Sequence, residues 1–216
     1  MDKVEIHGFV ASPPTRAVMM VCELIGVPYE MKYLEPLNKT PEFKKFNPEM
    51  TIPVLVDDGF VLIESRAIIQ YLMDKYAKDD SLYPKDLKTR AVINARLNFD
   101  CGTLWPKLVA AYRPTFFGGK ITDEELQIVK DTVSIVEEFL TRDKFLAGPK
   151  MTIADISFST TLSCLLEFGF DITPYPKVTA WLAECNKVTV INKLNQEGIN
   201  AFRQRLAEFQ KKSQNQ

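Results

Sequence analysis

The sequence predicts an α/β domain followed by an all-α domain. Strand and helix patterns alternate over the first 76 residues, whereas the apolar patterns after Pro84 have helical spacing only. A polar segment with proline and without periodicity separates the two stretches. We therefore expect the first domain at residues 1–78, a linker at 79–87 and the helical domain at 88–216.

The first domain is expected to contain its elements in the order βαβαββα. Strands are predicted at 4–10, 29–34, 54–56 and 60–63, and helices at 15–24, 41–46 and 64–76. The first helix ends at Gly26, with Pro28 just beyond it. A helix between two neighbouring strands implies a right-handed parallel crossover. This order, with a proline before the third strand, is the thioredoxin-like plan.

The hairpin formed by the third and fourth strands carries the first candidate site. Asp57-Asp58-Gly59 is a turn signal between the strands, and Ile52-Pro53 precedes them. An Ile-Pro bond at a strand mouth is a candidate cis peptide, which would leave the backbone of Ile52 open to an extended ligand. Ser65 and the free N–H groups that begin the next helix would accommodate a carboxylate. These features together predict a receptor for a small anionic peptide.

The second domain is expected to be built from helices with clear start signals. Helices are predicted at 88–108 (broken around Pro106), 122–140, 153–166, 177–188 and 200–211. Thr122 with Glu125, and Thr152 with Asp155, have the spacing of capping boxes, so Asp155 is expected to be structural. The helix after Thr152 is apolar on nearly all sides and is expected to be central and buried.

Composition excludes several classes of function. The 27 Lys and Arg residues nearly balance 28 Asp and Glu residues, which gives no reason to expect nucleic acid or an anionic membrane as a partner. No apolar run approaches the length of a membrane helix, and no signal peptide is apparent. The widely spaced cysteines indicate reduced core residues of a cytoplasmic protein. The single histidine, His7, has no companions for a metal site, so no metal is expected.

Ser12 lies in the loop after the first strand, at the start of the following helix. Its hydroxyl can donate a hydrogen bond to the thiolate of a bound ligand, and the positive end of the helix would stabilise that thiolate further. Lowering a thiol pKa from about 8.5 to about 6.5 takes about 2.7 kcal/mol, the scale of these two effects together. The alternative is that Ser12 only caps the helix, with Pro13 or Pro14 in its first turn.

Several of these motifs resemble the cytosolic glutathione transferases, the insect delta and epsilon classes most closely and the epsilon class in particular. Ser12 to Arg16 reads SPPTR, Thr51 to Pro53 reads TIP, and Glu64-Ser65 follows at the family's spacing. The resemblance extends over essentially the whole chain and implies the glutathione transferase fold, glutathione as co-substrate and a homodimer. It implies that Ser12 is the thiolate donor, that Ile52 pairs with the cysteinyl backbone of glutathione, and that Glu64 and Ser65 hold the γ-glutamyl end. Arg16 is expected to form a structural ion pair.

The chain departs from that pattern at the glycine end of glutathione. Delta and epsilon proteins usually carry histidines where this sequence has Met50 and Asn38. A thioether donates no hydrogen bond, so Asn38 and Lys39 are expected to replace the imidazoles. Met50, Thr51 and Pro53 complete the predicted glutathione site, with Arg66 as a further contact beside Glu64 and Ser65.

The electrophile needs an apolar pocket between the two domains. The candidates are apolar or aromatic, apart from one arginine that would orient an electron-poor or anionic substrate: Phe9, Val10, Leu104, Leu108, Tyr112, Arg113, Phe116, Phe117, Phe202 and Leu206. A solvated helix-end charge is the alternative reading of that arginine.

The preferred function is conjugation of glutathione to hydrophobic electrophiles in detoxification, with peroxidase or isomerase activity alongside. The alternative is a non-catalytic carrier of hydrophobic ligands, or a structural protein, with the same fold. A thiol transferase of the omega type would carry cysteine at the position of Ser12, and this sequence does not.

Overall fold

The computed structural model describes residues 3–34 and 40–214, apart from the side chains of residues 116–117 and 208–214. Its sheet has four strands in the order β2-β1-β3-β4. These are β1 Val4–Gly8, β2 Tyr29–Tyr33, β3 Val54–Asp57 and β4 Phe60–Ile63. β1 runs parallel to β2 and antiparallel to β3, which is antiparallel to β4. This mixed sheet confirms the thioredoxin-like plan.

The register of the sheet brings three chain segments to one edge. His7 pairs with Val54, and Val54 pairs with Ile63. The end of β1, the start of β3 and the end of β4 therefore lie side by side. The loop that carries Ser12, the Ile52-Pro53 bond and the residues after Ile63 all leave the sheet at this edge.

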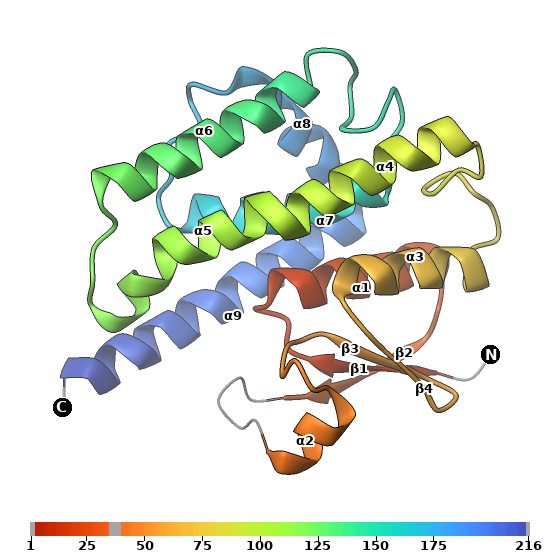
Figure 1. Ribbon diagram of the computed structural model, residues 1–216, viewed down its shortest axis with the longest axis horizontal. Helices are drawn as coiled ribbons and strands as arrows, with labels where there is room; N and C mark the ends of the chain where they lie inside the picture. The colour runs from red at the N-terminus through yellow and green to blue at the C-terminus, as the bar shows by residue number, and fades with distance from the viewer. Residues whose placement is uncertain (1–2, 35–39, 215–216) are drawn as a thin grey trace.

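Three helices accompany the sheet. They are α1 Pro13–Ile25, α2 Pro41–Phe46 and α3 Ser65–Tyr76. α1 and α3 pack against each other between the sheet and the helical half of the molecule, whereas α2 lies on the far side of the sheet (Figure 1). The Ile52–Pro53 peptide bond is cis, as predicted.

The helical half begins directly after the polar segment. Its elements are α4 Leu87–Phe99, the π-helix η1 Asp100–Leu104, α5 Trp105–Tyr112, the 3₁₀ helix η2 Arg113–Phe117, α6 Asp123–Phe139, α7 Ile153–Glu167, α8 Pro176–Asn186 and α9 Thr189–Gln214. Every residue of α7 from Ile153 to Leu165 is buried, which confirms that this helix is central. Within the described residues, no helix has the length and apolar character needed to cross a membrane.

Both predicted capping boxes are present. The hydroxyl groups of Thr122 and Thr152 cap α6 and α7, and Glu125 and Asp155 bond back to the cap residues. Asp155 also accepts hydrogen bonds from the Leu146 N–H at 2.9 Å and from the Trp181 indole N–H at 2.8 Å. Burial raises the pKa of this carboxyl group. Asp155 is thus a structural residue, as expected.

The break near Pro106 takes the form of a π-helix. Proline has no N–H to donate to the carbonyl of Gly102, four residues earlier, so the α-helical ladder is interrupted there. The chain widens over Asp100–Leu104, before the proline rather than at it. This segment turns Asp100 into the core, where it is fully buried.

The predicted start of the last helix at Asn200 is wrong. α9 begins at Thr189 and runs through Gly198 without interruption. A glycine inside a helix costs about 0.5–1 kcal/mol relative to alanine, so Gly198 does not favour a continuous helix by its own propensity. The reason for the glycine is α1: a Cβ atom at residue 198 would lie 2.3 Å from the Cδ atom of Arg16. Gly198 lets α9 approach α1 closely.

Candidate active site

Ser12 caps α1 and also faces a mostly apolar cavity. Its Oγ accepts a hydrogen bond from the Thr15 N–H at 3.4 Å, and Ser12 lines the cavity. A hydroxyl group that accepts one hydrogen bond still has its own hydrogen to donate. The two readings of Ser12, helix cap and thiolate donor, are therefore compatible with each other.

Arg16 lies behind the Ser12 loop and is 1% exposed. Its Nη1 donates to the carbonyl groups of Val10 and Ala11 at 3.2 and 3.0 Å. Its Nη2 donates to the Thr160 carbonyl and to the Ser163 hydroxyl on α7. No carboxylate of the described residues pairs with it, so the expected ion pair is wrong. Burial lowers the pKa of Arg16 to about 10.

The segment before β3 lines the same cavity through Met50, Thr51 and Ile52. Its backbone is held by Asn47, which is fully buried and donates from Nδ2 to the Thr51 carbonyl at 2.8 Å. Thr51 and Ile52 thus face the space next to Ser12. Asn38 and Lys39, the predicted contacts for the glycine end, lie outside the described residues.

The start of α3 presents polar groups at the neighbouring position on the sheet edge. Glu64 occupies the cap position with φ at 70° and makes no side-chain bond to the N–H groups of the first turn. Ser65 is 4% exposed, and its Oγ accepts a hydrogen bond from Arg66 at 3.0 Å. Burial raises the pKa of Glu64, and Glu49 raises it further through a side-chain hydrogen bond and through its negative charge. The uncapped N–H groups and the Ser65 hydroxyl form a site with the chemistry of a carboxylate receptor.

Arg66 directs most of its guanidinium group to Asp100 rather than toward the cavity. Its Nη2 and Nε lie 2.7 and 3.2 Å from Oδ2 of Asp100. The hydroxyl groups of Ser157 and Thr161 on α7 also donate to this fully buried carboxylate. Arg66 therefore orients Ser65 and connects α3 to the helical half.

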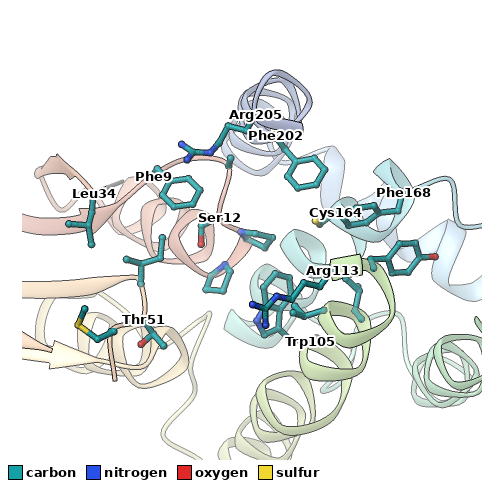
Figure 2. Close-up of a pocket in the computed structure, with 18 of the residues that line it drawn as sticks. Phe9, Ser12, Leu34, Thr51, Trp105, Arg113, Cys164, Phe168, Phe202 and Arg205 are labelled. Atoms are coloured by element: carbon teal, nitrogen blue, oxygen red, sulfur yellow. The ribbon is translucent and has the colours of Figure 1, made fainter. Parts of the chain in front are cut away.

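The cavity lies between the two halves and has a volume of about 450 Å³. Five of the predicted pocket residues line it: Phe9, Leu108, Tyr112, Arg113 and Phe202. Figure 2 shows Phe9 and Ser12 on the sheet side, with Trp105 and Arg113 on the helical side and Phe202 above them.

The other predicted pocket residues are placed differently. Leu104 is 1% exposed and belongs to the core, and Val10 packs against that core. Leu206 is partly buried on α9 and is not among the described lining residues. Nothing is described for the side chains of Phe116 and Phe117.

Several lining residues escaped the sequence analysis. They are Leu34, Phe43, Trp105, Val109, Cys164, Phe168 and Arg205. Trp105 and Val109 lie one helical turn from Leu108 and Tyr112, so the spacing could have revealed them. Arg205 likewise follows Phe202 by three residues on α9. Cys164 and Phe168 gave no signal, because α7 is apolar on nearly every side.

The comparisons with known proteins agree with this architecture. The family profile described as glutathione S-transferase, N-terminal domain, matches residues 6–80, and the corresponding C-terminal domain profile matches residues 100–188. Glutathione S-transferase D7 of Drosophila melanogaster is 39% identical over 215 residues, which cover 97% of this chain and 96% of that protein.

Solved structures of insect enzymes are similarly close. A delta-class glutathione transferase of Nilaparvata lugens has a TM-score of 0.89 and 35% identity, covering 95% of this chain and 99% of its own. An epsilon-class glutathione S-transferase of the housefly, Musca domestica, has a TM-score of 0.88 and 33% identity, and the match covers 96% of this chain and 98% of the housefly chain. With both domain profiles, the same fold and full-length relatives, this chain belongs to the glutathione S-transferase family.

Proposed function

We propose that this chain binds glutathione along the sheet edge and transfers its thiolate to an apolar electrophile held in the cavity. The observation that carries the proposal is the position of Ser12. Its hydroxyl caps α1 and borders the cavity, so that a sulfur atom placed there meets a donor and a helix N-terminus together.

The chemistry follows from the ionisation of a thiol. With a free pKa of about 8.5, a thiol at neutral pH is mostly protonated, and the thiolate is the nucleophile. The Ser12 hydroxyl donates to the sulfur and favours its charged form, while α1 adds a positive end. The thiolate then attacks the electrophilic carbon, a carbon–sulfur bond forms, and the leaving group departs with its electron pair.

The peptide is recognised mainly through backbone groups. We assign the cysteinyl backbone of glutathione to the main chain of Ile52, which lies before Pro53. The γ-glutamyl carboxylate is assigned to Ser65 and the first N–H groups of α3, and its ammonium group to Glu64. Arg66 supports Ser65 from behind. Thr51 and Met50 border the site, and Asn38 with Lys39 would meet the glycine carboxylate.

Further parts of the proposal rest on the family. We expect a homodimer that acts in the cytoplasm, and peroxidase or isomerase activity alongside conjugation. The domain division at 79–87 is part of the same expectation.

The direct test is conjugation of glutathione to an activated aryl halide by the purified protein. The proposal predicts turnover that depends on protein concentration and is lost largely in Ser12→Ala, while a glutathione analogue still binds. A carrier with this fold would bind the analogue without accelerating the reaction in either protein, and that outcome would contradict the proposal.

A further inference from the structure

We propose that the cavity selects apolar electrophiles that carry a carboxylate, and that Arg113 is the residue that recognises it. This inference rests on the proposed function, because it concerns the second substrate of the same site. It goes beyond that function by giving the substrate a charge and by assigning the determinant of specificity to one side chain.

The charge distribution of the cavity is one-sided. Its described lining residues are mostly apolar or aromatic, and two of them, Arg113 and Arg205, are cationic. No aspartate or glutamate is among the lining residues that the structure describes. A cavity with low-dielectric walls and charge of a single sign concentrates ligands of the opposite sign.

The two arginines differ in what they already contact. Nη1 of Arg205 donates to the hydroxyl of Tyr33 at 2.8 Å, and its guanidinium carbon lies 4.9 Å from the centre of the Phe9 ring. Arg205 thus connects α9 to the sheet side of the cavity. The guanidinium group of Arg113 has five N–H donors, and it makes no hydrogen bond or ion pair with any residue in the described part of the chain; the backbone N–H of Arg113 is bonded to the Val109 carbonyl.

Arg113 is placed where a substrate would reach it. It begins η2, directly after α5 supplies Trp105, Leu108 and Tyr112 to the cavity. Figure 2 shows Arg113 on the helical wall, across from the Ser12 loop and Thr51. An electrophile with its reactive carbon near Ser12 and its apolar body against Trp105 can therefore direct a terminal carboxylate toward Arg113.

Recognition of a carboxylate by arginine has a definite geometry and size. The planar guanidinium group binds carboxylates through two parallel hydrogen bonds, which lysine cannot reproduce. Arg113 is exposed, so solvent screening limits the gain, and we expect an effect of about fivefold in kcat/KM, the upper end of the range for exposed charge pairs.

The test uses an aryl enone that bears a para-carboxylate and the matching para-carboxamide. In both, the thiolate of glutathione adds to the β-carbon, the double-bond electrons move onto the enone oxygen, and solvent returns a proton to the α-carbon. The reaction needs no further reactant. Comparing the same two probes in each variant cancels their different intrinsic reactivities.

We expect Arg113→Gln to lower kcat/KM for the carboxylate about fivefold and to leave the carboxamide within about twofold. Arg113→Lys should recover only part of the preference. Lys107→Gln removes the same charge from an exposed position on α5 that does not line the cavity, and the preference should persist there. Added salt should weaken the preference only where Arg113 is present.

Three results would overturn the inference. The first is an equal loss for both probes in Arg113→Gln, and the second is an equal loss of preference in Lys107→Gln. The third is a higher KM for glutathione in Arg113→Gln with an unchanged probe ratio, which would assign the arginine to the peptide. Failure of the protein to conjugate even the carboxamide would instead contradict the proposed function.

Discussion

The two halves of the candidate site are built in different ways. The glutathione half consists of the Ser12 loop, the segment Thr51–Pro53 and the start of α3, which meet at one sheet edge because of strand register. The electrophile half consists mainly of side chains from α5, η2, α7 and α9, elements that are spread over the helical part of the sequence. The first half presents backbone groups and helix ends, and the second presents side-chain shape and charge.

Because of this difference, we expect side-chain substitutions to affect the two halves of the site unequally. A backbone N–H group stays in place when neighbouring side chains are replaced, as long as the sheet and the helix start persist. A cavity wall changes with every side chain that forms it. Glutathione recognition is therefore expected to be robust to substitution, and electrophile choice to be sensitive to it.

The largest expected effect is at the connection between the halves. Asp100→Asn leaves the guanidinium group of Arg66 buried beside a neutral partner, and unpaired buried charges destabilise by about 3–5 kcal/mol. Urea denaturation measures this loss. Glu167→Gln, which breaks the exposed pair with Arg203, is the control and should cost at most about 1 kcal/mol. Similar losses in both variants would contradict a structural connection through Asp100.

The next effect concerns the approach of α9 to α1. Gly198→Ala places a methyl group against Arg16 and should destabilise by about 1–3 kcal/mol, as overpacking of a filled space does. Gly102→Ala is the matched control, since a Cβ atom there meets nothing within 4 Å. Gly102→Ala should leave the melting temperature in thermal denaturation unchanged or raise it. Equal behaviour of the two variants would mean that α9 does not need its glycine.

The third prediction tests the charge of Glu64. Its pKa is raised by burial and by Glu49, so this carboxyl becomes protonated at a higher pH than an ordinary glutamate as the pH falls. The neutral form no longer attracts the ammonium group of glutathione, and binding should weaken as the pH falls through that pKa, by about 1 kcal/mol at most.

The pH profile of glutathione affinity, measured by calorimetry, checks this charge effect. Glu49→Gln should shift the weakening to lower pH, because one of the causes of the raised pKa is removed. Asp58→Asn, at the opposite end of the β3–β4 hairpin, should leave the profile unchanged. A profile unaffected by Glu49→Gln would disprove the coupling of the two acids.

The smallest effect is expected at Met50. Glutathione and γ-glutamylcysteine, which lacks the glycine, should differ in affinity by less than about fivefold in the natural protein, since exposed charge contacts contribute up to about 1 kcal/mol. Met50→His supplies a donor and should increase this difference. Unchanged discrimination in the variant would show that the thioether at this position has no consequence for recognition.

The sequence was informative where a structure depends on neighbouring residues. The capping box at Thr152, the hairpin turn at Gly59 and the cis bond before Pro53 all follow from short motifs. The partner of Arg66 did not follow, because Asp100 lies 34 residues away and reaches it only through the π-helix. Cys164 was missed for the same reason, since only tertiary packing brings it to the cavity.

The central claim is that the Ser12 hydroxyl stabilises the thiolate of glutathione. Thiolate absorbance of the enzyme–glutathione complex, titrated against pH in the natural protein and in Ser12→Ala, tests it most directly. The account predicts that the variant still binds glutathione and that the pKa of the bound thiol is higher than in the natural protein. The increase should be at most about two pH units, which correspond to roughly 2.7 kcal/mol. Identical titration curves would contradict it and leave Ser12 as a helix cap only.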